Sequence, residues 1–91
     1  MEYVWDEAKR RSNIRKHGID FLGVERLFAG ATVTIADDRF DYGEVRFVTL
    51  GLMEGRAVAV VHNESPNLIR VISIRKATKN EEKSYFEQIA D

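Results

Sequence analysis

Three stretches of β-branched and apolar residues follow one another with only short connections, and this spacing constrains the fold more than any other feature of the chain. The stretches are Val45–Gly51, Arg56–His62 and Leu68–Lys76. The connections, residues 53–55 and 63–67, are too short for a crossover helix, so consecutive strands must run antiparallel. A fourth stretch, Thr32–Ala36, has the same β-branched character. The sequence therefore predicts a four-stranded antiparallel sheet.

Two helices are predicted ahead of these strands. Asp6 is a suitable N-cap for a helix that runs to about His17, and Gly18 can end that helix in the left-handed conformation. Asp20 can cap a second, shorter helix in which apolar residues recur at helical spacing. Residues 3–5, before the first helix, are either a short strand or only the lead into that helix.

A third helix is predicted at the C-terminal end, where Thr78–Glu81 has the pattern of a capping box. The order of two helices, four strands and one helix indicates an α+β fold with its helices on one face of the sheet. Such a sheet leaves its other face to water or to a partner. No repeat, low-complexity tract or linker divides the chain, so residues 1–91 are expected to form a single domain.

The composition excludes some kinds of chemistry. The 91 residues include no cysteine, so neither a disulfide nor a catalytic thiolate is possible. The first residues lack the basic and apolar segments of a signal peptide, and the longest apolar run, Ala57–Val61, is too short to span a bilayer. A cytoplasmic protein with no membrane partner is therefore expected.

Charge is distributed unevenly along the chain. The net charge of −1 argues against a domain that is basic overall, as nucleic-acid-binding domains usually are. Basic residues nevertheless gather in the first helix, with no acid among them, and again towards the C-terminus. They are Lys9, Arg10, Arg11, Arg15 and Lys16, and then Arg70, Arg75, Lys76, Lys79 and Lys83. Local phosphate-binding patches therefore remain possible on a nearly neutral molecule.

Charged residues on the strands have two interpretations each. Arg70 and Arg75 point to opposite faces of the last strand, which suggests that at least one of them meets an anion or an acid. Alternatively, Arg75 and Lys76 only end the strand in solvent or in a surface ion pair. Glu44 and Arg46 share a strand face, either as an ion pair or as a carboxylate beside a phosphate-binding guanidinium.

His17, at the end of the first helix, has two interpretations. It is either a helix-end cap, or an acid, a base or a hydrogen-bond donor to a phosphate. Tyr85, in the last helix, is either a core residue or part of a site. His17 and His62 have no spacing typical of a shared metal ion, and no glycine-rich phosphate loop occurs. No metal site and no cofactor are therefore predicted.

Three parts of the chain, taken in order, resemble the BrnT family of toxins. They are Val4–Lys9 with Asn13–Phe21, then Asp38 with Gly43–Arg46, then Ile69–Thr78 with Glu81 and Tyr85. The resemblance covers nearly the whole chain. One mild departure, Gly23 in place of a better helix former, concerns only the second helix.

The resemblance implies a RelE-like fold and the toxin of a type II toxin–antitoxin system. Such a toxin is a metal-independent endoribonuclease that cleaves RNA and so inhibits translation. The resemblance also implies a BrnA-type antitoxin that neutralises the toxin. The complex of the two is expected to bind operator DNA largely through the antitoxin.

The residues are compatible with this chemistry. RNA supplies its own nucleophile, the 2′-hydroxyl, so cleavage needs a base, an acid and cations at the phosphate. We predict that Arg46 and Arg75 contact the scissile phosphate, and that Glu44 or His17 transfers the proton. Further residues are predicted to bind RNA or its phosphates, namely Arg70, Lys76, Lys16 and Tyr85.

Two alternatives remain, a non-catalytic protein-binding module and an inactive corepressor of the same family. Convergence of Arg46, Arg75 and His17 in one groove would favour the ribonuclease. Arginines scattered singly among acids would favour the binding module. A toxin is also expected to expose an apolar or aromatic patch beside its groove until an antitoxin covers it.

Overall fold

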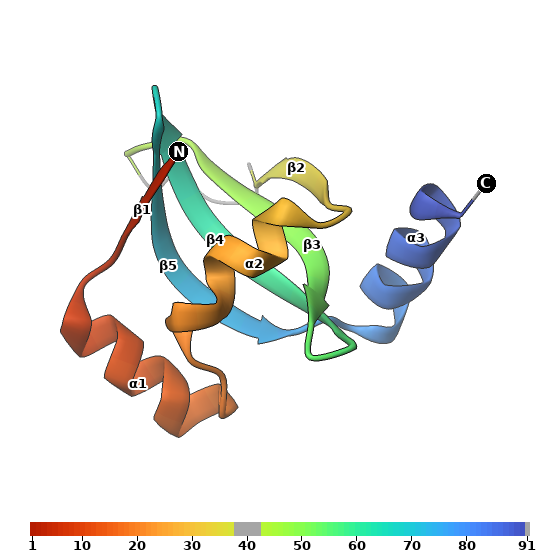
Figure 1. Cartoon of the computed structure of the whole chain (residues 1–91), viewed down its shortest axis with the longest axis horizontal. Coiled ribbons are helices and arrows are strands. Elements are labelled where there is room, and N and C mark those ends of the chain that lie inside the picture. The colour runs from red at the N-terminus through yellow and green to blue at the C-terminus, as the bar shows by residue number, and fades with distance from the viewer. Residues whose placement is uncertain (38–42, 91) are drawn as a thin grey trace.

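The computed structural model, which describes residues 1–37 and 43–90, contains one mixed sheet of five strands (Figure 1). The strands are β1 (Glu2–Val4), β2 (Val33–Asp37), β3 (Arg46–Met53), β4 (Arg56–Ser65) and β5 (Leu68–Lys76). They lie in the order β1-β5-β4-β3-β2. The pairs β2–β3, β3–β4 and β4–β5 are antiparallel, as the short connections predicted, whereas β1 runs parallel to β5.

The predicted architecture, a four-stranded antiparallel sheet of the RelE-like kind after two helices, is therefore wrong in its sheet. Residues 2–4 add a fifth strand, with Glu2 opposite Leu68 and Val4 opposite Arg70. A strand of three residues is too short to leave a period-two pattern in the sequence. Its hydrogen bonds come from a partner more than sixty positions away, so only the folded chain distinguishes this strand from a lead into the helix.

The three predicted helices are confirmed. They are α1 (Glu7–His17), α2 (Val24–Ala29) and α3 (Lys79–Ile89), and a 3₁₀ turn, η1 (Phe21–Gly23), precedes α2. The side chain of Asp6 accepts the N–H of Ala8 at 2.7 Å, and Gly18 ends α1 with φ of 69°. Thr78 and Glu81 form the expected reciprocal capping box at the start of α3. These boundaries were predictable because caps are local interactions.

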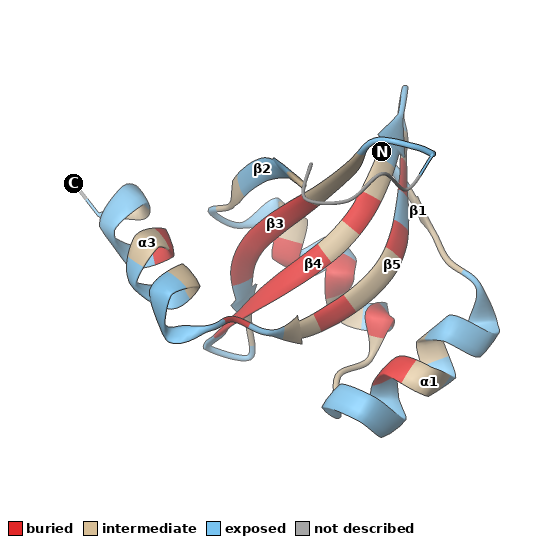
Figure 2. Ribbon diagram, turned by 180° about the vertical axis from the view of Figure 1, so that it is seen from behind, coloured by how far each residue is buried: buried red, intermediate tan, exposed pale blue. Residues whose placement is uncertain are grey.

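The core has two parts, one on each face of the sheet. On one face, side chains of β4 and β5 pack against η1 and α2; the buried residues there are Phe21, Val24, Leu27, Val58, Val60, Ile69, Val71 and Ile74. On the other face, Val48, Leu50 and Ala59 pack against Tyr85 of α3. Figure 1 shows α2 crossing in front of the strands, and Figure 2 shows the buried stretches of β3, β4 and β5 from behind.

The expectation that all helices lie on one face is therefore wrong as well. Residues 48–51 of β3 and 57–60 of β4 are buried at consecutive positions. Successive strand residues point to opposite faces, so these two strands need cover on both sides. The helix α3 supplies the cover on the second face.

None of the helices in residues 1–37 and 43–90 has the length and apolar character needed to cross a membrane.

Candidate functional site

A groove of about 700 Å³ opens on the face of the sheet that carries α2. Its walls are the turn after α1, the start of α2 and the hairpin between β3 and β4. Leu27, Met53 and Val58 form an apolar floor. Leu22 and Leu52, with 64% and 38% of their surfaces exposed, place apolar side chains at the rim.

Basic side chains also line this groove, namely His17, Arg26, Arg56 and Lys76. Arg26, Arg56 and Lys76 form no ion pair with another residue in the described part of the chain. Arg26 and Arg56 were not predicted from the sequence. They come from a helix and a strand that are far apart along the chain, and only the fold brings them to one groove.

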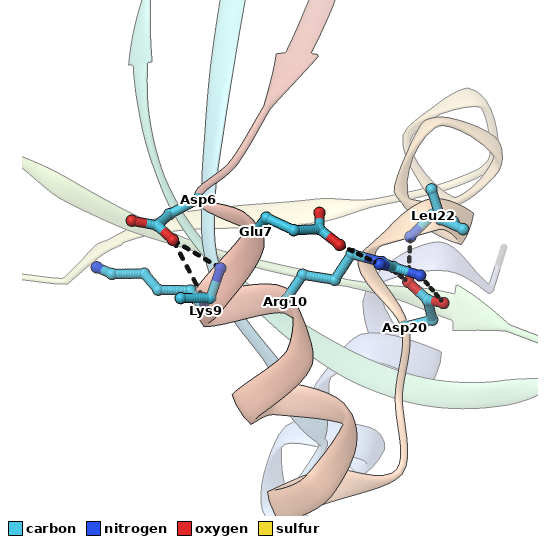
Figure 3. Close-up of polar contacts among 7 residues, drawn as sticks. Asp6, Glu7, Lys9, Arg10, Asp20 and Leu22 are labelled. Carbon is cyan, nitrogen blue, oxygen red and sulfur yellow. Dashed lines mark hydrogen bonds and ion pairs between the residues drawn. The ribbon is translucent and has the colours of Figure 1, made fainter.

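Two of the described residues that line the same groove are acids, Asp20 and Glu54, and the first is already paired with an arginine. Arg10 donates to both carboxylate oxygens of Asp20, at 2.8 and 3.0 Å, and also binds Glu7 (Figure 3). Hydrogen bonding from Arg10 holds the pKa of the Asp20 carboxyl below its usual value. Even with both acids counted, the described lining has more cations, since Arg26, Arg56 and Lys76 face two carboxylates.

A smaller hollow of about 190 Å³ lies between α1 and β5. Lys9, Ser12 and Lys16 line it from the helix, and Ser73 lines it from the strand. His17 lines both this hollow and the larger groove, so the two meet at that residue.

Asn13 fixes α1 against β5. Its side-chain oxygen accepts the N–H of Ile74 at 3.1 Å, and its amide donates to the carbonyl of Ile74 at 2.9 Å. The same amide donates to the carbonyl of Ile19 at 2.9 Å. Asn13 therefore satisfies the edge of β5 beyond the point where β1 ends, much as a neighbouring strand would. The helical spacing of Lys9, Asn13 and Lys16 is visible in the sequence, but the backbone partners of Asn13 are not.

Glu44, Arg46 and Arg70 lie towards the other end of the sheet. The Nε of Arg46 is 3.5 Å from a Glu44 oxygen, and Asn63 donates to the other Glu44 oxygen at 3.0 Å. Asn63 is opposite Arg70 in the register, and Asp37 is opposite Arg46. Asp38 and Asp41, the acids between Asp37 and Glu44 in the sequence, lie outside the described residues.

Arg75 joins the end of β5 to the start of α3. Its guanidinium donates to both oxygens of Glu81, at 2.7 and 3.0 Å. These bonds lower the pKa of the Glu81 carboxyl, although partial burial opposes the shift. Adjacent strand residues point to opposite faces, so Arg75 lies on the face of α3 while Lys76 reaches the groove.

Tyr85 lies in the second part of the core, with 1% of its surface exposed. Its hydroxyl donates to the carbonyl of Ala31 at 2.8 Å, which ties α3 to the segment before β2. A role for Tyr85 in RNA binding stays a prediction.

The predicted site residues thus fall into three places. Lys16, His17 and Lys76 line the groove and the hollow; Glu44, Arg46 and Arg70 lie at the far end of the sheet; Arg75 and Tyr85 lie against α3. Arg46, Arg75 and His17 do not converge in one groove. No group of three or more metal-ligating side chains occurs within residues 1–37 and 43–90.

Comparison with known families gives a match over residues 5–81, to the family described as the ribonuclease toxin, BrnT, of type II toxin–antitoxin systems. The matched segment contains every described residue that lines the groove or the hollow, but not Tyr85. Comparison with the curated proteins gives no match.

Proposed function

Because this chain belongs to the BrnT family of ribonuclease toxins of type II toxin–antitoxin systems, we propose that it cleaves RNA without a metal ion, in the groove lined by His17 and Lys76. The unpaired cations of this groove are the observation that supports this location for the active site. A phosphodiester that enters it meets Arg26, Arg56 and Lys76, none of which has to leave an ion pair first.

The reaction needs no reagent besides the RNA. The 2′-oxygen attacks the adjacent phosphorus, the bond from phosphorus to the 5′-oxygen breaks, and a 2′,3′-cyclic phosphate and a 5′-hydroxyl result. One group removes the proton of the 2′-hydroxyl and another protonates the leaving oxygen. His17 is the proposed proton-transfer group, because its imidazole lines the groove and its two ring nitrogens can donate and accept a proton. Lys76, with Arg26 and Arg56, stabilises the charge that builds on the phosphorus oxygens.

The predicted roles of Arg46, Arg75 and Glu44 make a distinct proposal about location. If Arg46 and Arg75 hold the scissile phosphate, the RNA must displace Glu44 from one and Glu81 from the other. The supporting argument is that guanidinium groups bind phosphate and carboxylate by the same bidentate geometry. In that arrangement Glu44, once released, would act as the base.

The proposed partner is a BrnA-type antitoxin that covers the groove and thereby blocks cleavage. Support comes from the exposed Leu22 and Leu52 at the rim, which a protein partner buries more readily than RNA does. Cleavage of messenger RNA by the free toxin would inhibit translation. Binding to operator DNA is proposed for the complex, through the antitoxin.

Induced expression with and without the cognate antitoxin tests this proposal. Growth arrest that the antitoxin relieves is expected, and His17→Ala or Lys76→Ala should abolish the arrest without loss of soluble protein. Lys79→Ala is the matched control, because this lysine is exposed and lies outside the groove. If Arg46→Ala and Arg75→Ala abolish the arrest while His17→Ala and Lys76→Ala retain it, the active site lies at the other location.

Cleavage by the purified protein tests the chemistry directly. We expect activity to persist in EDTA and the products to carry 2′,3′-cyclic phosphate ends. Activity that EDTA abolishes and Mg²⁺ restores would exclude the metal-independent mechanism.

A non-catalytic binding module, or an inactive corepressor of the same family, is the second candidate. The pairs Arg46–Glu44 and Arg75–Glu81 favour it, because arginines held by acids are what such a module would show. Good expression with no growth arrest and no RNA cleavage, together with a stable antitoxin complex, is the result expected for this candidate.

A further inference from the structure

The hollow between α1 and β5 has the chemical character of an anion site. Lys9, Lys16 and His17 contribute basic groups, and Ser12 and Ser73 contribute hydroxyls. Among the residues that the structure describes, no carboxylate lines it. Neither lysine side chain forms an ion pair or hydrogen bond within the described part of the chain.

The acids at the start of α1 and just after its end are engaged elsewhere. Glu7 and Asp20 both bind Arg10, as Figure 3 shows. Asp6 accepts the N–H groups of Ala8 and Lys9 at the start of the helix. The cations of the hollow therefore have no competing carboxylate among the residues that line it.

The helix that carries these lysines is held rigidly. Lys9 and Lys16 lie four residues before and three residues after Asn13, so all three share one side of α1. Asn13 is 4% exposed and bonded to the backbone of Ile74, which turns that side towards β5. The two lysines are about 10 Å apart along the helix axis. Their flexible side chains can both reach one anion between them.

The hollow meets the larger groove at the edge of β5. Ser73 borders the hollow and Lys76 borders the groove, on opposite faces of this strand and about 10 Å apart along it. His17 lines both. A single strand of RNA whose scissile phosphate lies at Lys76 can therefore continue past His17 into the hollow.

We propose that this hollow, formed by Lys9, Ser12, Lys16 and Ser73, binds a phosphodiester of the RNA strand next to the one that is cleaved. This inference rests on the proposed function, since it places the flanking part of the same substrate. The site makes the protein prefer RNA longer than a dinucleotide. It reads backbone phosphate and therefore adds affinity with little base preference.

Binding of RNA that cannot be cleaved tests the site without relying on catalysis. Fluorescein-labelled random-sequence RNA with 2′-O-methyl groups, two or eight nucleotides long, is titrated with protein at several salt concentrations. The Lys9→Ala/Lys16→Ala variant should bind the octanucleotide more weakly, with a log–log salt slope shallower by about 0.7, the value for one phosphate of a single strand. It should bind the dinucleotide as the unmodified protein does, because a single phosphate occupies the groove at Lys76.

The matched control is Arg11→Ala/Arg15→Ala, which removes the same charge from exposed positions of α1 outside the hollow. If both double variants weaken octanucleotide binding equally, the effect is general attraction and the site is wrong. Octanucleotide binding unchanged in Lys9→Ala/Lys16→Ala also overturns the proposal. The proposal is also overturned if, in NMR spectra, inorganic phosphate shifts the amide signals of Lys16 and Ser73 but the RNA does not. It is overturned as well if the only effect of Lys9→Ala/Lys16→Ala is that the antitoxin no longer relieves the growth arrest.

Lys76→Ala separates this inference from the proposed function. If that variant cleaves RNA normally while Lys9→Ala/Lys16→Ala loses octanucleotide affinity, the groove assignment fails and the phosphate site stands. If Lys76→Ala is inactive and Lys9→Ala/Lys16→Ala is unaffected, the reverse holds.

Discussion

Asn13 shows how one buried side chain decides where an exposed helix sits. It has one of the most polar side chains in this protein's interior, and each of its hydrogen bonds goes to backbone groups of Ile74 or Ile19. Because α1 presents only a thin apolar surface, hydrogen bonding rather than hydrophobic burial orients it. The basic residues on either side of Asn13 owe their position to this one amide.

Asn13→Ala should therefore be destabilising. It leaves the N–H and C=O of Ile74 without their partners, and we expect the free energy of unfolding to fall by about 2–4 kcal/mol. Urea denaturation measures this loss. Arg11→Ala, an exposed change on the same helix, should alter stability by less than about 0.5 kcal/mol. A similar small loss for Asn13→Ala would show that these bonds do not hold α1.

His62 is a buried titratable group that the proposed mechanism does not use. Its ring is 0% exposed and lies against those of Phe28 and Phe47, with centroids 5.4 and 5.9 Å away. Its Nε2 is 2.7 Å from the hydroxyl of Thr49, while Nδ1 has no hydrogen-bond partner. Burial lowers the pKa of His62, although the Glu64 carboxylate, 3.5 Å away, opposes the shift.

This histidine makes stability depend on pH. Because burial lowers the pKa of His62 in the folded protein, the unfolded chain binds a proton more readily as the pH falls through about 6.5, so acid favours unfolding. We expect the free energy of unfolding to decrease below pH 6.5 by up to about 1.4 kcal/mol per pH unit from this group. Urea titrations between pH 5 and 7.5 measure the slope. His62→Gln should flatten it, and equal slopes in the two proteins would rule out His62 as its source.

Among the elements, α2 and β3 make a contact that only glycine permits. A Cβ on Gly51 would lie 2.8 Å from Cδ2 and 2.9 Å from Cγ of Leu27. Leu27 is 2% exposed and lies in the core between α2 and the sheet, so it has little room to move. The distance between α2 and the sheet, and with it one wall of the groove, therefore depends on Gly51.

Gly51→Ala should push α2 away from β3 and lower the free energy of unfolding by about 1–3 kcal/mol. Thermal or urea unfolding measures the loss. Gly30→Ala is the control, because the nearest atom to its Cβ is at an ordinary 3.6 Å. A smaller side chain at Leu27, as in Leu27→Val, should reduce the cost of Gly51→Ala. If the two changes are instead simply additive, the crowding argument fails.

At the scale of the whole molecule, a nearly neutral protein gathers unpaired cations in two adjoining depressions, the groove and the hollow. The net charge is −1, yet unpaired cations follow the groove and the hollow. They are Lys9, Lys16, Arg26, Arg56 and Lys76. Arg10 supports this surface indirectly, because it pairs with Asp20 from the side of α1. Net charge alone is therefore a poor guide to what this protein binds.

Binding of single-stranded RNA should accordingly depend on salt in spite of the net charge. Contact with three or four phosphates predicts a log–log slope of about −2 to −3 for the affinity of the 2′-O-methyl octanucleotide. Fluorescence anisotropy between 50 and 300 mM KCl, roughly the range in which counterion release is measured, gives the slope. A slope near zero would show that phosphates are not bound along this surface.

The sequence by itself determined those structural features that local interactions control. Short-range hydrogen bonds explain the caps at Asp6, Gly18 and Thr78. Loop length explains the antiparallel pairing of β3, β4 and β5. The helical periodicity of α3 allowed a core position for Tyr85, which is buried. The clustering of basic residues in α1 was also visible in the chain.

Only the tertiary structure decided what depends on contacts between distant segments. The pairing of β1 with β5, the cover of both sheet faces and the meeting of His17 with Lys76 at one groove each join residues that are far apart in sequence. The glutamate partners of Arg46 and Arg75 are near neighbours in sequence, but the same spacing also allows a solvent-exposed arginine. The local sequence pattern does not show whether the ion-paired or the solvent-exposed arginine has the lower free energy. That difference depends on the packing of the whole chain.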